Sequence, residues 1–359
     1  MKKIIFFFGS FDPLHKGHIS IMEKAMQEIG ADELYIGLNA SSPKGDLTSL
    51  LHRTEMLKLF ITTNTKYKLI PFSFDFNAID ETYQKIFNML ESENKYYILI
   101  GEDQLSNLKN WYNYDYLVSK FNFIVARRDN SSVNYNYNND NRFIFINHDN
   151  KNLSSRLVKQ GNYHYTIESI KNYILENNLY LKEQISLYVS DKRWAHIISV
   201  AKTALLINEK AHLNLNPLAV EKAALLHDVA RDMDIKIQEK LMKEHYSDDI
   251  QTHPNTYHQY IGEHIANKVF MVTNKDILNA IKYHTTGRAN MSLLEKLVYV
   301  SDKIEPTRKY DTTQLIDSCC NDFESGFKKV LEHNKDYVKN ILHENYEIKS
   351  LECFNYYLD

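Results

Sequence analysis

The stretch IIFFFGSFDPLHKGH at residues 4–18 decides the fold of the first half of the chain. Ile4 to Phe8 is continuously apolar, which is typical of a strand buried on both faces of a parallel sheet. A turn beginning at Gly9 follows, and helical periodicity then runs from Lys16 to Ile29. The stretch therefore predicts a strand, a tight turn and a helix, the unit from which α/β folds are built.

The same alternation continues beyond this unit. Short apolar runs recur at Leu34–Leu38, Tyr96–Ile100 and Phe123–Ala126, with helical segments such as Leu50–Ile61 between them. These patterns predict an α/β domain with a parallel sheet over residues 1–182. After Tyr180 the strand signals nearly vanish and amphipathic helices follow one another, which predicts an all-α domain over residues 183–359.

Length and composition agree with two globular domains. The 359 residues are enough for two cores, and Lys+Arg 43 against Asp+Glu 46 leaves a net charge of -3, without the positive field of a nucleic-acid-binding protein. Three cysteines without a CxxC pair exclude a disulfide framework and a zinc ribbon. No run approaches the roughly 18 apolar residues of a membrane span, and Ile4–Phe8 is too short for a signal peptide. We expect a cytoplasmic protein without nucleic-acid or membrane partners.

The turn at residues 9–18 has the features of a phosphate-binding loop. Small residues let the backbone approach an anion, and the following helix offers unpaired N–H groups and the positive end of its dipole. His15 and His18 lie three residues apart, on one face. The HxxH spacing alone favours two incidental histidines, but the whole ten-residue string reverses that preference and fits a triphosphate.

With these residues, the first half resembles the nucleotidyltransferases that carry an HxGH signature, and more closely the bacterial nicotinate-mononucleotide adenylyltransferases. Further matching strings occur in the family's order: Ser42-Pro43-Lys44, His52-Arg53, Gly101-Glu102-Asp103 with Trp111, Leu153-Ser154-Ser155 through Lys159, and Tyr173-Ile174 through Leu179-Tyr180. The chain departs from the family at Phe8, where a second glycine is usual, at Lys159, where arginine is usual, and at Asn77-Ala78, which replace Tyr-Thr near the pyridine carboxylate.

The resemblance implies a Rossmann-like domain that transfers the adenylyl group of ATP to nicotinate mononucleotide, with Mg²⁺ accompanying the ATP. Such a transfer depends on positioning and on charge neutralisation at the α-phosphate. The implied catalytic phosphate ligands are His15, His18, Lys44 and Lys159. The other implied binding residues are Gly9, Ser10, Phe11, Asp12, Arg53, Gly101, Asp103, Trp111, Ser154 and Ser155. Trp111 offers a flat face for a pyridine ring, with a core or lid tryptophan as the alternative.

A second set of polar residues stands in apolar surroundings in the C-terminal half. His227 and Asp228 interrupt the apolar helical run Ala223–Ala230, where two polar side chains are costly unless something binds them. The set is completed by His196, His258, His284 and Asp302. Imidazole with carboxylate suits iron, manganese or zinc better than magnesium, and Asp228 could reach across to bridge two ions.

The third histidine of this set has rivals at His245, His253 and His264. We choose His258 because it falls in a helix that Asn255 or Thr256 could cap, whereas the Pro254 that follows His253 disfavours a helix there. His264 would lie on a different side of the same helix.

These six residues resemble the ligands of HD-domain phosphohydrolases. Their flanks are similar to the bacterial symmetrical diadenosine tetraphosphate hydrolases, in Arg193–His196, Leu225–Asp228, His284–Gly287 and Ser301–Pro306 with Arg308. The resemblance implies two divalent transition-metal ions, iron or manganese, a catalytic Asp228, and hydrolysis of the tetraphosphate to two ADP. Arg193, Lys303 and Arg308 are candidate phosphate contacts, with structural salt bridges as the alternative.

The sequence therefore predicts a bifunctional enzyme of NAD biosynthesis and nucleotide hydrolysis. Its expected partners are ATP, nicotinate mononucleotide and diadenosine tetraphosphate. As alternatives, the first half adenylylates nicotinamide mononucleotide or pantetheine phosphate or is a cytidylyltransferase. The second half hydrolyses another nucleotide or binds one as a regulatory module without turnover. A class I aminoacyl-tRNA synthetase is disfavoured because no Lys-Met-Ser-Lys-Ser string is present. The identity of the metals and a homo-oligomeric state are left open.

Overall fold

The computed structural model describes residues 1–41, 45–75, 78–127, 137, 140–147, 153–250, 252–341 and 347–359. Lys44, which the sequence predicts to be catalytic, and Asn77, expected near the pyridine carboxylate, lie outside the described residues. The chain forms two compact units, Met1–Ile174 and Leu175–Asp359. This division falls before the domain boundary expected after residue 182, and the functional bounds of the two domains stay a prediction.

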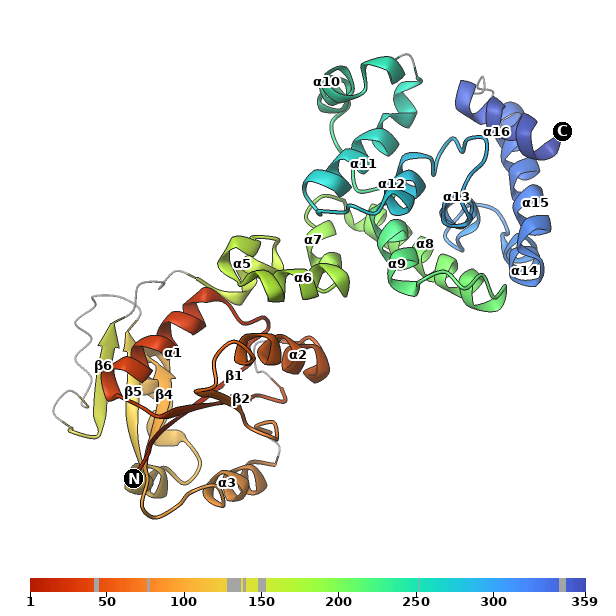
Figure 1. Cartoon of the computed structure of the whole chain (residues 1–359). Coiled ribbons are helices and arrows are strands. Elements are labelled where there is room, and N and C mark those ends of the chain that lie inside the picture. The colour runs from red at the N-terminus through yellow and green to blue at the C-terminus, as the bar shows by residue number, and fades with distance from the viewer. Residues whose placement is uncertain are drawn as a thin grey trace. The chain divides into compact units, whose positions relative to one another are not determined.

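The first unit is built on a parallel sheet (Figure 1). Among the described residues, six strands pair in the order β3-β2-β1-β4-β5-β6. Their bounds are β1 Lys3–Gly9, β2 Glu33–Leu38, β3 Tyr67–Leu69, β4 Lys95–Gly101, β5 Phe121–Arg127 and β6 Phe143–Asn147. β1 pairs with both β2 and β4. The chain therefore builds the sheet outward from β1 to β3 in one direction and then outward from β4 to β6 in the opposite direction. In doubly wound sheets of this kind, the ligand crevice opens at the carboxyl ends of the two strands where the order reverses.

Helices cover both faces of this sheet. They are α1 Lys16–Ile29, α2 Leu50–Ile61, α3 Ile79–Phe87, the 3₁₀ helix η1 Glu102–Asn110 and α4 Tyr114–Lys120. Beyond β6 the chain continues into α5 Ser155–Lys159, the 3₁₀ helix η2 Tyr163–Tyr165 and α6 Glu168–Glu176. Phe6 of β1 belongs to a core shared with α3, η1 and α4. Its neighbour Phe7 points to the other face, where its ring meets Phe11 and the first turn of α1 at His18. The connections after β1 and after β4 therefore leave toward opposite faces of the sheet.

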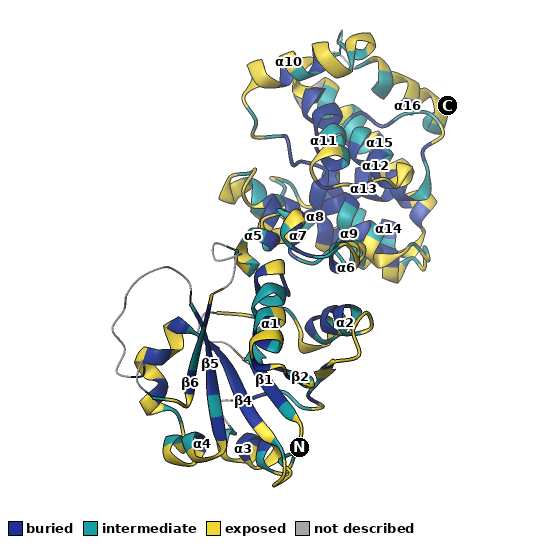
Figure 2. Ribbon diagram, turned by 60° about the vertical axis from the view of Figure 1, so that its left-hand side comes forward, coloured by how far each residue is buried: buried dark blue, intermediate teal, exposed yellow. Residues whose placement is uncertain are grey.

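In its described residues the second unit contains helices joined by turns and no strands. Its α-helices are α7 Leu181–Ile185, α8 Asp191–Lys210, α9 Pro217–Leu226, α10 Ile235–His245, α11 Tyr257–Lys268, α12 Lys275–Lys282, α13 Leu293–Ile304, α14 Thr313–Asn321, α15 Phe323–Asp336 and α16 Ile348–Leu358. Short 3₁₀ helices lie at Ser247–Asp249 and Pro254–Thr256, and a π-helical segment lies at Tyr337–Ile341. Figure 2 shows α8, α9, α11, α12 and α13 as the buried centre, whereas α10 and α16 turn exposed faces outward. The candidate metal ligands come from this buried centre.

The fold confirms the predicted class, an α/β domain followed by a helical one. The helices expected at Lys16–Ile29 and Leu50–Ile61 have those bounds. None of the helices in the described part of the chain combines the length and apolar character that a bilayer-spanning helix needs.

Candidate active sites

The first candidate site is the loop between β1 and α1. His15 is the N-cap of α1, and its Nδ1 accepts a hydrogen bond from the backbone N–H of Gly17 at 3.1 Å. The Nδ1 of His18 accepts from the backbone N–H of His15 at 3.4 Å, which closes a reciprocal capping box. The two rings stack with centroids 3.7 Å apart. The structure thus brings His15 and His18 together at the carboxyl end of the central strand.

This capping arrangement sets the tautomer of both histidines. A backbone N–H can only donate, so Nδ1 of each neutral ring is an acceptor and Nε2 carries the proton. Each ring therefore has an Nε2–H donor, the group that a phosphate oxygen accepts from. The ring of Phe11 packs edge-on against the His18 ring, with the two centroids 5.1 Å apart, and helps to hold the His18 ring in place.

Asp12 ties the loop to α5. Its Oδ2 accepts from the Lys159 ammonium at 2.6 Å and from the backbone N–H of Thr48 at 3.2 Å. Ser155, the first residue of α5, donates its hydroxyl to the carbonyl of Pro13 at 2.9 Å. Lys159 and Ser155 thus reach the loop across a long stretch of sequence, as the resemblance implies. Ser154, at the N-cap of α5, is exposed and makes no side-chain capping bond.

Phe11 and Arg53 are among the predicted binding residues whose side chains are buried. Phe11 is 2% exposed, and its ring lies 3.0 Å from where a Cβ on Gly9 would stand, so Gly9 makes room for it. Arg53 is 1% exposed and donates to the backbone carbonyls of Thr48, Ser10 and Asn39. Both side chains brace the loop, and a direct contact of either with substrate stays a prediction.

At the neighbouring strand end, Gly101 closes β4 and Asp103 lies in the first turn of η1. A Cβ at position 101 would stand 2.5 Å from the Asp103 carboxylate, so glycine leaves room for this side chain to fold back over the strand end. Since β1 pairs with β4, Gly9 and Gly101 open on the same crevice. Trp111 follows η1 and is half-buried against the core on that face of the sheet.

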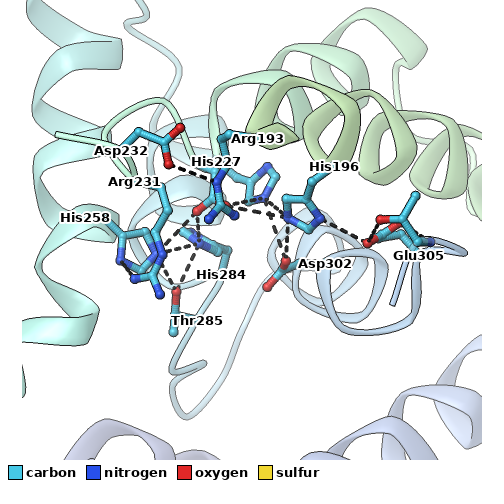
Figure 3. A network of polar contacts seen from close by, with 12 residues as sticks. Arg193, His196, His227, Arg231, Asp232, His258, His284, Thr285, Asp302 and Glu305 are labelled. Atoms are coloured by element: carbon cyan, nitrogen blue, oxygen red, sulfur yellow. Dashed lines mark hydrogen bonds and ion pairs between the residues drawn. The ribbon is translucent and has the colours of Figure 1, made fainter. Parts of the chain in front are cut away.

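The second candidate site gathers all six predicted metal ligands. Figure 3 labels His196, His227, His258, His284 and Asp302 among them. His196 comes from α8, His258 from the first turn of α11 and Asp302 from α13. His227 and Asp228 follow α9, and His284 follows α12. The sequence interpretation that His227 and Asp228 lie inside a helix is wrong, because α9 ends at Leu226 and the chain tightens there into successive turns.

Asp228 divides the cluster into two positions. Its Oδ2 lies 3.6 Å from His196 Nε2 and 3.7 Å from His227 Nε2, and these two nitrogens are 3.3 Å apart. Its Oδ1 lies 3.4 Å from His258 Nε2 and 3.3 Å from His284 Nε2, which are 3.2 Å apart. We call these the His196–His227 position and the His258–His284 position. Within the described residues, each is a group whose ligand atoms could hold one ion.

Asp302 completes the His196–His227 position, with Oδ1 at 3.2 Å from His196 Nε2 and 3.8 Å from His227 Nε2. A tetrahedral ion with bonds of about 2.0–2.1 Å places its ligand atoms about 3.3–3.4 Å apart. The observed spacings bracket this value, so the residues present fit divalent cations in both positions.

The charges of the cluster also fit cations. Burial opposes ionisation of Asp302, but Lys303 and Arg308 outweigh it and hold the pKa of that carboxyl well below its usual range. The surrounding imidazoles overcome burial in the same way and lower the pKa of Asp228. Burial lowers the pKa of His227 to about 4 and lowers that of His258 as well, so both are neutral, as ligands must be.

Three predicted phosphate contacts are engaged with the ligand carboxylates. Arg193 lies 2.6 Å from Asp228 Oδ2, Arg308 lies 2.5 Å from Asp302 Oδ1, and Lys303 lies 2.8 Å from Asp302 Oδ2. These are the salt bridges named as the alternative. A role of the same cations in binding phosphate stays a prediction, supported by their place at the rim of the cluster.

Sequence reasoning missed three residues that touch the ligands. Glu305 Oε1 lies 3.0 Å from His196 Nδ1, the Arg231 guanidinium lies 2.7 Å from His258 Nδ1, and the Thr285 hydroxyl lies 3.1 Å from His258 Nε2 and 3.0 Å from His284 Nε2. Glu305 and Thr285 belong to segments that resemble the hydrolases. The signal that could have identified them is their closeness in sequence to the predicted ligands Asp302 and His284. Arg231, three residues after Asp228, had no signal of its own.

Two family models match the two halves of the chain separately, and the boundary between the compact units falls between the two matches. The Cytidylyltransferase-like family model matches residues 6–161, and the HD domain model matches residues 193–307. The first match contains the described histidine loop and the strand ends around it. The second contains all six candidate metal ligands.

Relatives match each half and the whole chain. A Mycoplasma genitalium protein named "probable nicotinate-nucleotide adenylyltransferase/Ap4A hydrolase" is 29% identical over 95% of this chain and 99% of its own length. An Endomicrobium trichonymphae protein named "probable nicotinate-nucleotide adenylyltransferase" is 32% identical over 50% of this chain and all of its own length. A Bacillus subtilis "bis(5'-nucleosyl)-tetraphosphatase, symmetrical" is 34% identical over 34% of this chain and 66% of its own length.

Proposed function

Because the first half of the chain belongs to the nicotinate-nucleotide adenylyltransferase family and the second half contains an HD domain, we propose a bifunctional enzyme. The first half transfers the adenylyl group of ATP to nicotinate mononucleotide, forming deamido-NAD and releasing pyrophosphate. The second half hydrolyses diadenosine tetraphosphate to two ADP. The observation that carries the second activity is Asp228, whose two oxygens face two separate pairs of histidines.

In the adenylyl transfer, a phosphate oxygen of the mononucleotide bonds to the α-phosphorus of ATP, and the bond from that phosphorus to pyrophosphate breaks. The Nε2–H groups of His15 and His18 donate to phosphate oxygens on which negative charge builds up. Lys159, held by Asp12 at the same loop, adds a positive charge near them. Mg²⁺ enters with the ATP.

In the hydrolysis, water adds to one of the two central phosphorus atoms, and the bond from that atom to the central bridging oxygen breaks. His196, His227, Asp228 and Asp302 would hold one cation, and Asp228, His258 and His284 would hold a second. Two divalent ions supply activation of water and neutralisation of the phosphate charge. The imidazole-rich donor set favours iron or manganese over magnesium. Arg193, Lys303 and Arg308 line the approach of the anionic chain.

Chelation of metal should abolish hydrolysis of diadenosine tetraphosphate, whereas adenylyl transfer at the histidine loop should be retained once Mg²⁺ is supplied. After removal of metal with EDTA and dialysis, Fe²⁺ or Mn²⁺ should restore hydrolysis of diadenosine tetraphosphate better than Mg²⁺, because four of the six ligands are imidazoles. The measurement is ADP release with each added ion, and adenylyl transfer assayed with Mg²⁺ is the control. Full hydrolysis by a metal-free preparation, or restoration by Mg²⁺ alone, would contradict the proposal.

The pyridine pocket should discriminate only modestly. Asn77 and Ala78 replace the Tyr and Thr expected there, and Ala78 has no side-chain donor for a carboxylate. We expect the kcat/KM ratio for nicotinate over nicotinamide mononucleotide to stay below about 10⁴, the discrimination of a fully hydrogen-bonded site. Steady-state kinetics with both substrates measures it, and Ala78→Thr is expected to raise the ratio. A wild-type ratio above that value would show that the substitution does not weaken selectivity.

A further inference from the structure

The four histidines of the cluster differ in what holds the ring nitrogen that faces away from the cation positions. His227 Nδ1 lies 2.6 Å from the carbonyl of Ala224, and His284 Nδ1 lies 2.7 Å from the carbonyl of Ile281. Carbonyls only accept, so both rings carry their proton on Nδ1 and turn the Nε2 lone pair inward. Each position thus has one histidine that is already oriented as a ligand.

The second histidine of the His196–His227 position has a carboxylate behind it. His196 Nδ1 lies 3.0 Å from Oε1 of Glu305, which is 1% exposed. Thr307 donates to Glu305 from its backbone N–H at 2.7 Å and from its hydroxyl at 2.6 Å. A buried carboxylate fixed in this way orients the ring and makes Nε2 a better donor to a cation.

The second histidine of the His258–His284 position has a cation behind it. The Arg231 guanidinium lies 2.7 Å from His258 Nδ1 and donates to the carbonyl of Asn255 at 2.6 Å. A guanidinium has no lone pair to offer, so Nδ1 of His258 must accept. The ring proton then lies on Nε2, the nitrogen that faces the cation position, and a positive charge stands directly behind the ring.

The carboxylates are divided unequally as well. Asp228 serves both positions, whereas Asp302 Oδ1 lies beside the nitrogens of the His196–His227 position. At the other position the structure places, besides Asp228 Oδ1, the neutral hydroxyl of Thr285 next to the histidine nitrogens. The His196–His227 position therefore has one carboxylate ligand more than the other position, although Arg193, Lys303 and Arg308 offset part of the charge of its carboxylates. The contacts behind His196 and His258, rather than net charge, then decide between the two positions.

We propose that the two positions fill in a fixed order, the His196–His227 position first and the His258–His284 position second and more weakly. Glu305 is the positioning residue that strengthens the first position, and Arg231 is the one that weakens the second. This inference rests on the proposed function in assuming that the cluster binds two divalent ions.

Titrating metal-free full-length protein with Mn²⁺ tests the order. Calorimetry should resolve two steps whose dissociation constants differ by at least about tenfold, the smallest effect of losing such an outer partner. Electron paramagnetic resonance should show an isolated bound ion up to one equivalent and a spin-coupled pair only above it. Two equal steps, or a coupled pair below one equivalent, would overturn the order, whereas no binding at all would overturn the proposed function itself.

Two variants assign the order to its residues. Arg231→Met should tighten the second step roughly tenfold, because it removes a charge beside His258, and should leave the first step within about threefold. Arg231→Lys keeps the charge and should leave the second step weak. Glu305→Gln should weaken the first step by about 10–100-fold, so that the two steps draw together.

Thermal unfolding in the presence of a chelator checks that each variant is folded. If Glu305→Gln does not fold, the two variants of the half-buried Arg231 still test the proposed order. A second step that Arg231→Met leaves unchanged would refute the role of Arg231. A first step that folded Glu305→Gln leaves unchanged would refute the role of Glu305.

Discussion

The Asp228→Ala protein is expected to lose hydrolysis of diadenosine tetraphosphate by at least roughly 10³-fold in kcat, or about 4 kcal/mol of barrier. Both oxygens of this carboxylate face histidine pairs, so its loss removes a ligand from each cation position at once. Adenylyl transfer should stay near the wild-type rate, because the histidine loop lies in the other compact unit. Steady-state assays of both reactions on the same preparation measure this.

Two further variants make the Asp228 result specific. Asp228→Asn keeps the shape of the side chain and should lose as much activity, which separates the loss of charge from the loss of packing. Asp234→Asn is the matched control, because Asp234 caps α10 through Lys236 N–H and asparagine caps equally well. Appreciable hydrolysis by Asp228→Asn, or loss of adenylyl transfer in a folded Asp228→Ala protein, would contradict two separate sites.

The reciprocal result is expected from His18→Ala. Removing the His18 ring deletes one Nε2–H donor and the stacking partner of His15 at 3.7 Å, so kcat for adenylyl transfer should fall by about 10²–10³-fold. Hydrolysis of diadenosine tetraphosphate should be unchanged within error. Quantifying pyrophosphate release and ADP release in parallel checks both statements.

His164→Ala is the control for this variant. His164 is exposed and lies in η2 of the same unit, where its ring packs on Tyr165. Its replacement should leave adenylyl transfer within about twofold, a change of less than half a kcal/mol. If His18→Ala keeps most of the transfer activity, or His164→Ala loses it, the phosphate-binding role of the loop is wrong.

Much of the fold was predictable because buried parallel strands read as continuous apolar runs. β1, β2, β4 and β5 were all found in this way, and they are the four central strands of the sheet. The edge strands β3 and β6 were missed. β3 has only three residues, and β6 has intermediate and exposed positions, so neither shows the apolar signal of a strand covered on both faces.

The cluster of histidines and aspartates was predictable as a set, because burying so many polar side chains is costly unless something binds them. All six predicted side chains converge, including His258 chosen over three rivals. The turn at His227 and Asp228 could not be foreseen, because an apolar run looks the same in a helix and in the tight turns that end one. The outer contacts of Glu305 and Arg231 join α13 and the turn after α9 to distant helices, and no local pattern encodes such pairs.

The histidine loop was predictable from its ten-residue string, but its inner architecture was not. The sequence places Arg53 and Phe11 among ligand contacts, and the structure buries both side chains under the loop. The Arg53 guanidinium donates to three backbone carbonyls of its own chain. The sequence alone does not distinguish such an arginine from one that binds a phosphate.

The central claim, two different phosphate chemistries in one chain, is tested most directly by product analysis of the full-length protein. It is incubated with ATP plus nicotinate mononucleotide and, separately, with diadenosine tetraphosphate in ¹⁸O-labelled water. We expect deamido-NAD with pyrophosphate from the first mixture. From the second we expect ADP as the only nucleotide, with one ¹⁸O in one of the two ADP molecules per turnover. Equal amounts of AMP and ATP from the second mixture, or no dinucleotide from the first, would contradict the account.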